Sequence, residues 1–370
     1  MNNQPDILVL GLGPAGACAA TACAKAGFNV MAIEKKAIAG APVQCAEFVP
    51  AMIGSEVAAL NETSIQAIRS MVTFVEDQPP DFMANFPGRM IDREGFDREL
   101  GEQAKAAGAE LHYGLKAQNI SDTGTLTLSN GNQILPRILI GADGPNSLAG
   151  NAIGSVISDY LETRQISVPL LQAFDNTDIF LSQHITGGYA WAFPKAGVVN
   201  IGLGVHPQAR SHMKTLLDEL HQKLIAEGRV GSQILGHTGG RIPASGMVKP
   251  WGVIGSTLCL LAGDAAGLTN PITGAGINSA VISGKLAGDA AVHYLSNDNN
   301  ITAADNYQED LEDLFGASLA RAVAHRQRLA TYWHQDNTPS PEQLRGGWIA
   351  YDQYWQNQNT ISIKENPCPA

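Results

Sequence analysis

The sequence predicts an α/β fold in which an antiparallel sheet is joined to a parallel-sheet domain. Residues 6–34 have the pattern of a strand, a glycine-rich turn, an alanine-rich helix and a second strand, which is the start of a βαβ unit. Residues 165–205 change to alternating, aromatic-rich segments typical of antiparallel strands. The fully apolar residues 258–263 then return to the pattern of a strand buried in a parallel sheet.

Composition restricts the classes of function. The chain has 370 residues, 44% of them hydrophobic, which is enough for a large core. The formal net charge of -11 argues against nucleic-acid partners and against binding to anionic lipid through a polybasic segment. The five cysteines are scattered and the N-terminus lacks a signal-peptide pattern, so we expect a cytoplasmic protein. No apolar run reaches the roughly 20 residues that span a bilayer, so we expect no stable membrane insertion.

The remaining elements follow in order along the chain. Residues 92–107 have a helical period, and residues 110–113, 125–129 and 135–140 are predicted short strands. Residues 213–227 form an amphipathic helix, and residues 276–294 and 305–333 are two further helices. The tail from residue 338 has no clear period and is rich in aromatic residues, so it is expected to pack on the body or on a partner.

The first glycine-rich turn has the spacing of a dinucleotide-binding motif. Gly11 permits the tight turn, Gly13 lets a pyrophosphate approach the helix N-terminus, and Gly16 lets the helix meet the strand. Glu34 ends the second strand, where a carboxylate accepts hydrogen bonds from a ribose. The other predicted contacts of this motif are Pro14, Ala15 and Lys35.

A second glycine-rich block, residues 263–278, indicates FAD as the dinucleotide. Asp264 follows a buried strand and can accept a hydrogen bond from the ribityl chain of an extended flavin. Backbone N–H groups at the start of helix 276–294 would favour negative charge on the reduced ring. The block supplies the predicted contacts Gly263, Asp264, Gly274, Ala275, Gly276, Ile277 and Asn278. The simpler alternative is a strand–loop–helix crossover with glycines for close packing.

These motifs, with the Gly-Ala-Asp-Gly turn at residues 141–144, occur in the order typical of para-hydroxybenzoate hydroxylase-like flavoproteins. The chain resembles that family over residues 5–330. Within it, the YAWAFP sequence at residues 189–194, followed by Gly-Leu-Gly at 202–204, resembles the YxWxFP…GxG signature of the geranylgeranyl reductase-related branch. The loop Gln-Cys-Ala-Glu at 44–47 resembles the cysteine-containing loop of that branch, although the branch more often has Gly at position 46.

The resemblance implies a domain division. A discontinuous Rossmann-like, glutathione-reductase-like FAD-binding domain would take residues 1–75, 90–160 and 250–335. An antiparallel β-sheet substrate domain would take residues 76–89 and 161–249, and residues 336–370 would form a C-terminal tail.

The resemblance also implies roles for single residues. Arg93 would lie near the flavin, and Asp143 would close the cofactor-binding turn. Cys45 and Glu47 would lie beside the substrate face of the ring, and Trp191 would line the pocket, which makes these three the candidate catalytic residues. Each role has a simpler alternative. Arg93 would belong to a surface helix rich in ion pairs, and Asp143 to an Asx turn. Cys45 would be a buried structural thiol, and Trp191 would pack in the core of its sheet. The nine histidines lack metal-ligand spacing, so no metal is predicted.

Several reactions remain open for an FAD-dependent oxidoreductase with this pocket. Because the chain is short for the branch and lacks a membrane-docking segment, we first expect a monooxygenase-type flavoprotein that hydroxylates an aromatic group. The Cys-Ala-Glu-Phe loop resembles flavoproteins that install cysteine tryptophylquinone, which implies a tryptophan in a precursor protein of an amino-acid oxidase as substrate. The alternatives are a prenyl double-bond reductase, in which Cys45 delivers a proton, and a non-catalytic flavoprotein chaperone. NAD(P)H is the expected transient electron donor, although no second GxGxxG marks a site for it.

Overall fold

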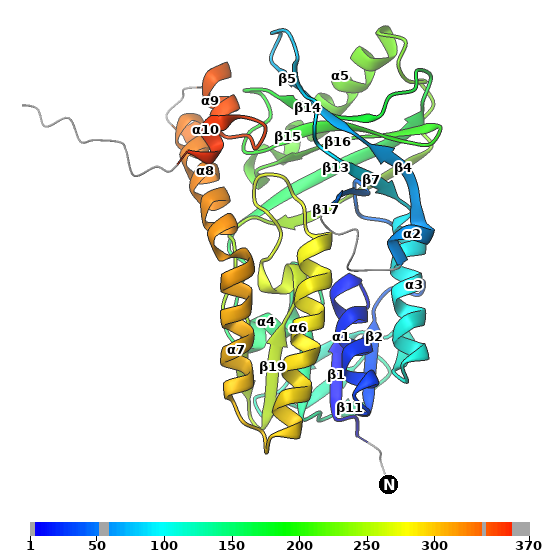
Figure 1. The fold of residues 1–370 in the computed structure, drawn as a ribbon, viewed down its shortest axis with the longest axis vertical. Helices are drawn as coiled ribbons and strands as arrows, with labels where there is room; N and C mark the ends of the chain where they lie inside the picture. The colour runs from blue at the N-terminus through cyan, green and yellow to red at the C-terminus, as the bar shows by residue number, and fades with distance from the viewer. Residues whose placement is uncertain (1–3, 52–58, 335–337, 357–370) are drawn as a thin grey trace, which may run out of the picture.

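A six-stranded sheet organises the first half of the molecule. The computed structural model describes residues 4–51, 59–334 and 338–356 (Figure 1). The strand order is β18-β19-β12-β1-β2-β8, and neighbouring strands are parallel except at the edge strand β18. The strands are β1 (Ile7–Leu10), β2 (Val30–Glu34), β8 (Glu110–Tyr113), β12 (Ile138–Gly141), β18 (Trp251–Ile254) and β19 (Thr257–Leu261). The predicted α/β class is therefore confirmed.

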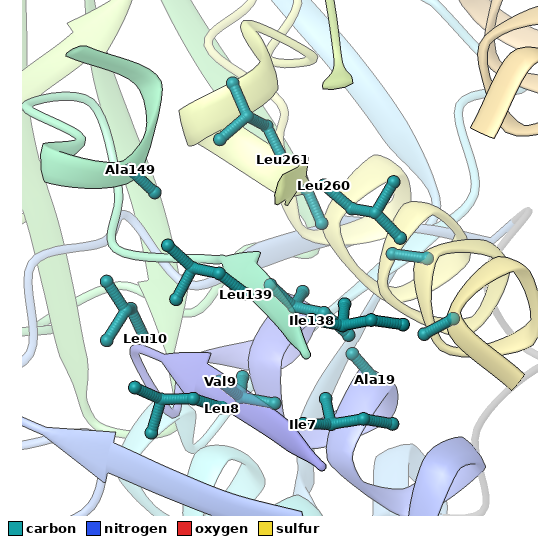
Figure 2. Packing of buried hydrophobic residues seen from close by; sticks show 14 of the residues in the cluster. Ile7, Leu8, Val9, Leu10, Ala19, Ile138, Leu139, Ala149, Leu260 and Leu261 are labelled. Carbon is teal, nitrogen blue, oxygen red and sulfur yellow. The ribbon is translucent and has the colours of Figure 1, made fainter. Parts of the chain in front are cut away.

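Both faces of this sheet are buried. Figure 2 shows side chains of β1, β12 and β19 directed toward Ala19 on one face and Ala149 on the other. This double burial explains why β1 is an uninterrupted apolar run. The helices of this half are α1 (Pro14–Lys25), α3 (Arg93–Ala106), α4 (Leu148–Ala152), α6 (Ile277–Ser296) and α7 (Thr302–Leu311), and a small sheet beside them contains β9 (Ala117–Ile120), β10 (Leu126–Leu128) and β11 (Gln133–Ile134).

Helices α1 and α6 pack on each other through small residues. A Cβ atom added to Gly284 of α6 would lie 2.2 Å from the carbonyl oxygen of Ala15, at the start of α1. One added to Gly288 would lie 2.6 Å from the Cβ of Ala22. The glycines therefore allow the two helices that begin at the predicted cofactor motifs to approach at backbone distance.

A seven-stranded sheet forms the second half, in the order β17-β13-β16-β15-β14-β5-β6. Neighbouring strands are antiparallel except β14 and β5. Helix α5 (Met213–Ala226), preceded by η2 (Pro207–His212), covers one face, and the aromatic side chains of β15 cover the other. The strands are β5 (Ser70–Val75), β6 (Asp81–Met83), β13 (Tyr160–Pro169), β14 (Asn176–Leu181), β15 (Tyr189–Lys195), β16 (Val198–Val205) and β17 (Gly236–Pro243).

The junction between the halves differs in one strand from the expected division. Residues 70–75 were expected in the first domain, but β5 pairs in parallel with β14, with Ser70 opposite Asn176. Its backbone hydrogen bonds therefore place it in the second sheet. Around it lie α2 (Ala59–Thr63) and a small sheet of β3 (Phe48–Pro50), β7 (Gly88–Ile91) and β4 (Ser64–Ile68).

The C-terminal part returns from the first half to the second (Figure 1). Helix α7 continues through the π-helical turn η4 (Glu312–Gly316) into α8 (Ala317–His334), which agrees with the predicted helical stretch. Two short helices follow, α9 (Pro341–Gly346) and α10 (Asp352–Trp355), where the sequence shows no period. Across the described residues, no helix combines the length and apolarity that a bilayer crossing requires.

Replacing Gly284 with Ala tests the close packing of α1 and α6. The added methyl group would overlap the Ala15 carbonyl, so we expect a loss of stability of about 2 kcal/mol, measured by denaturant unfolding. The matched control is Gly316→Ala in η4, where the nearest described neighbour of the new Cβ would be the Glu312 Cβ at 3.9 Å and helix propensity improves. Equal stability of the two variants would contradict the packing described here.

Candidate active site

The first glycine turn joins strand to helix and leaves room beside the helix N-terminus. Gly11 has φ +91°, and a Cβ there would lie 2.3 Å from the Ala142 carbonyl oxygen. A Cβ at Gly16 would lie 1.8 Å from the Gly11 carbonyl oxygen. Around Gly13, by contrast, no described residue other than its immediate chain neighbours comes within 4 Å of the Cβ position. Pro14 begins α1 and Ala15 is buried behind it, so the open space faces the N-terminal N–H groups of α1.

Glu34 stabilises this turn through hydrogen bonds to the backbone. Its carboxylate accepts hydrogen bonds from the backbone N–H of Leu12 and of Lys36, each at 2.9 Å. The carboxylate is thus held at the carboxyl end of β2, beside the glycine turn. The Lys35 side chain is exposed at the same edge.

Asp143 has the capping role that its sequence context allows. Its carboxylate accepts from the Ser147 hydroxyl and the Leu148 N–H, both at 2.6 Å, at the start of α4. Burial raises the pKa of Asp143, while these hydrogen bonds oppose the rise. Since the Ala142 carbonyl lies against Gly11, the two predicted cofactor turns are adjacent. A contact of Asp143 with the cofactor stays a prediction.

The second glycine block converges on the N-terminus of α6. Asp264, in the 3-10 turn η3 (Gly263–Ala266), accepts a hydrogen bond from the Thr269 hydroxyl at 2.5 Å. A Cβ at Gly276 would lie 3.3 Å from Asp264 Oδ1, so the glycine lets the helix start beside the carboxylate. Gly274, with φ +70°, and Ala275 shape the loop, and Ile277 starts the helix.

Asn278 provides a test of whether these residues fit a bound flavin. Within the described residues, its Oδ1 is buried and has no hydrogen-bond partner. A buried polar atom of this kind normally has one. An unsatisfied acceptor in the first turn of α6, together with the open space at Gly13, fits an extended cofactor that reaches from α1 to α6.

Arg93 connects the second block to the cysteine loop. Its guanidinium donates to Asp97, with an Nε to Oδ1 distance of 2.7 Å. Burial lowers the pKa of Arg93, but the adjacent Asp97 and Cys45 raise it above the ordinary value. Burial raises the pKa of Asp264, and the nearby Arg93 opposes that rise. The guanidinium is therefore close enough to Cys45 and to the Asp264 carboxylate to affect both electrostatically.

The cysteine loop is held against the second sheet through its backbone. The carbonyl oxygen of Cys45 accepts from Gln165 Nε2 at 3.2 Å, and that of Ala46 accepts from Asn200 Nδ2 at 3.3 Å. The Thr238 hydroxyl donates to the Val43 carbonyl at 2.5 Å. The backbone of the loop is thus held on β13, β16 and β17 of the second sheet, while the Cys45 thiol lies next to Arg93, at the start of α3 in the first half.

Glu47 is buried, and its carboxylate is fully occupied by protein groups. The Lys195 ammonium lies 2.8 and 2.7 Å from its two oxygens, and Asn200 Nδ2 lies 3.1 Å away. The backbone N–H of Arg93 also donates to it at 3.1 Å. Glu47 itself has φ +68°, a strained conformation for a non-glycine residue. These contacts favour a positioning role for Glu47 over the direct chemical role expected from the sequence.

Trp191 lies in an aromatic row on β15. Its indole N–H donates to Gln165 Oε1 at 2.9 Å, and its ring lies over Gly202, where a Cβ would come within 2.5 Å of the indole. Ring centroids are 6.2 Å apart for Phe193 and Trp191 and 5.6 Å apart for Trp191 and Tyr189. The Tyr189 hydroxyl donates to the Thr273 carbonyl at 2.6 Å. The row therefore links the cysteine loop, through Gln165, with the cofactor loop.

Three residues of this site were missed from the sequence: Gln165, Lys195 and Asn200. Two of them stand out in the sequence as polar residues in apolar or aromatic strands. Asn200 is a buried amide in the otherwise apolar strand β16, and Lys195 ends an aromatic strand, so each requires a polar partner.

Comparison with known proteins identifies the family. Residues 163–241, which run from within β13 to within β17, match the geranylgeranyl reductase catalytic domain. The digeranylgeranylglycerophospholipid reductase 1 of Methanopyrus kandleri is 32% identical over 344 residues, 86% of this chain and 89% of that protein. The chain belongs to the geranylgeranyl reductase-like family of FAD-dependent oxidoreductases. The digeranylgeranylglycerophospholipid reductase of Methanosarcina mazei is 30% identical and is matched over 88% of this chain and 83% of its own length.

Solved structures agree with this assignment. A geranylgeranyl bacteriochlorophyll reductase-like protein from Thermoplasma acidophilum superposes with a TM-score of 0.79 at 25% identity, over 97% of this chain and 94% of that one. PqsL from Pseudomonas aeruginosa, a probable FAD-dependent monooxygenase, gives a TM-score of 0.67 at 17% identity over 93% and 99% of the two chains, which shows a shared fold alone. The geranylgeranyl reductase-like protein described here is thus an enzyme with a para-hydroxybenzoate hydroxylase-like fold, as the sequence predicts, rather than a non-catalytic chaperone.

Replacing Asp264 with Ala tests the cofactor contact at α6. We expect the ratio of flavin absorbance to protein absorbance to fall at least ~10-fold, because a charge-assisted hydrogen bond to the ribityl chain is lost. Asp218→Ala, at an exposed carboxylate of α5, is the control and should keep full occupancy. An Asp264→Ala protein as yellow as wild type would count against this site.

Replacing Glu47 with Ala tests the positioning role. The change leaves Lys195, whose side chain is 20% exposed, without its carboxylate, so we expect a loss of about 3 kcal/mol in denaturant unfolding. The double variant Glu47→Ala/Lys195→Met should recover part of this loss, because it removes the unpaired charge as well. If the single variant is as stable as wild type, the ion pair does not hold the loop.

Proposed function

We propose that this FAD-dependent oxidoreductase reduces carbon–carbon double bonds of an isoprenoid chain. The observation that carries the proposal is its near full-length relationship to proteins named digeranylgeranylglycerophospholipid reductases. The site geometry supports it, since the Cys45 thiol lies beside Arg93 and the row of aromatic rings reaches the cofactor loop at Tyr189.

Saturation of a double bond adds a hydride to one carbon and a proton to the other. Bound FAD, in its reduced form, supplies the hydride. We assign the proton to the Cys45 thiol, which lies beside the guanidinium of Arg93. As the proton leaves sulfur for carbon, the positive charge of Arg93 stabilises the thiolate, and solvent then returns a proton to it.

The surrounding residues keep this donor in place. Asp97 orients the Arg93 guanidinium, and Glu47 fixes the loop that carries Cys45. Trp191 and Phe193 offer the apolar surface on which an isoprenoid chain can lie without water. We infer that a nicotinamide nucleotide, NAD(P)H, binds transiently and reduces the cofactor between turnovers.

Oxygenation of an aromatic group, the first expectation from the sequence, is the second candidate. The observation that favours it is the row of rings Tyr189, Trp191 and Phe193, which offers stacking partners to a planar substrate ring. Oxygenation of a tryptophan in a precursor protein, as in tryptophylquinone biogenesis, is supported by the Cys-Ala-Glu-Phe loop alone. Both reactions share the cofactor and the pocket, and they differ in whether oxygen is consumed.

An anaerobic single-turnover experiment with Cys45→Ala tests the proposal. Reduced wild-type protein mixed with geranylgeranyl diphosphate should reoxidise its flavin and yield a product heavier by two hydrogen atoms. Cys45→Ala should do so at least ~100-fold more slowly, because the acid is lost, while its flavin content stays normal.

Cys259→Ala is the control, since that thiol is buried in β19, away from the loop. The reductase proposal fails if the reduced wild-type flavin is not reoxidised by the diphosphate without oxygen, while an aromatic compound is hydroxylated when oxygen is present. The second candidate would then take its place.

A further inference from the structure

We propose that Trp348 closes one end of the substrate pocket and sets the length of the apolar chain that the enzyme accepts. The inference rests on the proposed function and extends it to the C-terminal segment, defined here as residues 340–355. This segment contains α9 and α10 and lies next to the end of α8 (Figure 1). The sequence predicts only that its aromatic residues pack on the body or on a partner.

Trp348 continues the aromatic row beyond Tyr189. Its side chain is buried, with 3% exposure, and its ring centroid lies 4.7 Å from that of Tyr189. Tyr189 in turn contacts Trp191 and is tied to the cofactor loop through Thr273. A chain that starts at Cys45 and follows the rings along β15 therefore meets Trp348 at the far end.

The space at that end is almost filled. Tyr189, Ile272, Leu344 and Trp348 line an apolar cavity there, together with Leu181 and Trp333. The cavity has a volume of about 30 Å³, which is room for about two water molecules. An isoprene unit needs more room than this. With the indole in place, a chain has to stop near Tyr189.

The C-terminal segment is held in place by contacts that do not involve the indole of Trp348. Arg345 donates to Asp81 at 2.9 Å and to Gln78 at 2.6 Å, and the Tyr351 hydroxyl donates to Asp81 at 2.7 Å. These contacts attach both sides of Trp348 to β6 and the turn before it.

Further contacts attach the segment to α8. Arg328 donates to the Gly346 carbonyl at 3.0 Å, and the His325 ring lies 4.3 Å from that of Tyr354. By contrast, within the part of the chain that the structure describes, the indole N–H of Trp348 meets only the Met71 sulfur, at 3.4 Å, which is a weak acceptor. The role of this side chain is therefore to fill volume, and removing it should leave the segment in position.

The Trp348→Ala variant tests the length limit. We expect the ratio of kcat/KM for geranylgeranyl diphosphate to that for the shorter geranyl diphosphate to rise ~10-fold or more over wild type, because added carbons become buried. Trp355→Ala is the control: this residue is 54% exposed and lies on α10, outside the cavity lining. It should leave the ratio unchanged. An unchanged ratio in Trp348→Ala, with a normal melting temperature, would overturn the inference.

A binding measurement separates this inference from the proposed function. Saturated long-chain and short-chain alkyl diphosphates, titrated calorimetrically, report chain length without turnover. The ratio of their dissociation constants should shift ~10-fold toward the longer chain in Trp348→Ala. If that ratio stays at the wild-type value, the length limit is wrong even where reduction is observed. If it shifts while no double bond is reduced, the length limit stands and the reductase proposal falls.

Discussion

The carboxylate of Glu47 is the contact on which the arrangement of the site depends. It binds Lys195 and Asn200 of the seven-stranded sheet and the backbone N–H of Arg93 at the start of α3. A buried carboxylate with a strained backbone persists only where its partners satisfy it, and here they come from both domains. The loop before Glu47 is thereby confined to the domain junction, and Cys45 with it.

That confinement has an electrostatic consequence. The Arg93 guanidinium, held by Asp97, lies close enough to both the Cys45 thiol and the Asp264 carboxylate to interact with them electrostatically. Near Asp264, α6 begins with its N–H groups facing the cofactor loop, which favours negative charge there. Under the proposed function, the Arg93 guanidinium would stabilise the Cys45 thiolate left after proton transfer, and the N-terminus of α6 would face the cofactor.

Local patterns in the sequence predict the cofactor-binding half well. The turn at Gly11 and the block around Asp264 depend on residues close together in the chain, or on strand ends that meet at one edge of a parallel sheet. The sequence places Glu34 at the end of its strand but does not predict its hydrogen bond with Leu12. The partners of Glu47 are far away along the sequence, so no spacing rule finds Lys195 or Asn200. The strand at residues 70–75 was assigned to the wrong half for the same reason, because its pairing with β14 is non-local. The preference for oxygenation relied on chain length and a missing docking segment, whereas the relationship to named reductases favours the alternative.

The central claim is that the Glu47 contacts place the Cys45 thiol against the flavin. Absorption spectroscopy of the oxidised, FAD-loaded protein during a titration to high pH tests it most directly, since a thiolate in contact with oxidised flavin produces a long-wavelength charge-transfer band. We predict that the band appears in wild type and in Cys259→Ala, is absent in Cys45→Ser, and weakens in Glu47→Ala. A wild-type spectrum without the band, or a band that survives Cys45→Ser, would contradict the placement of this thiol.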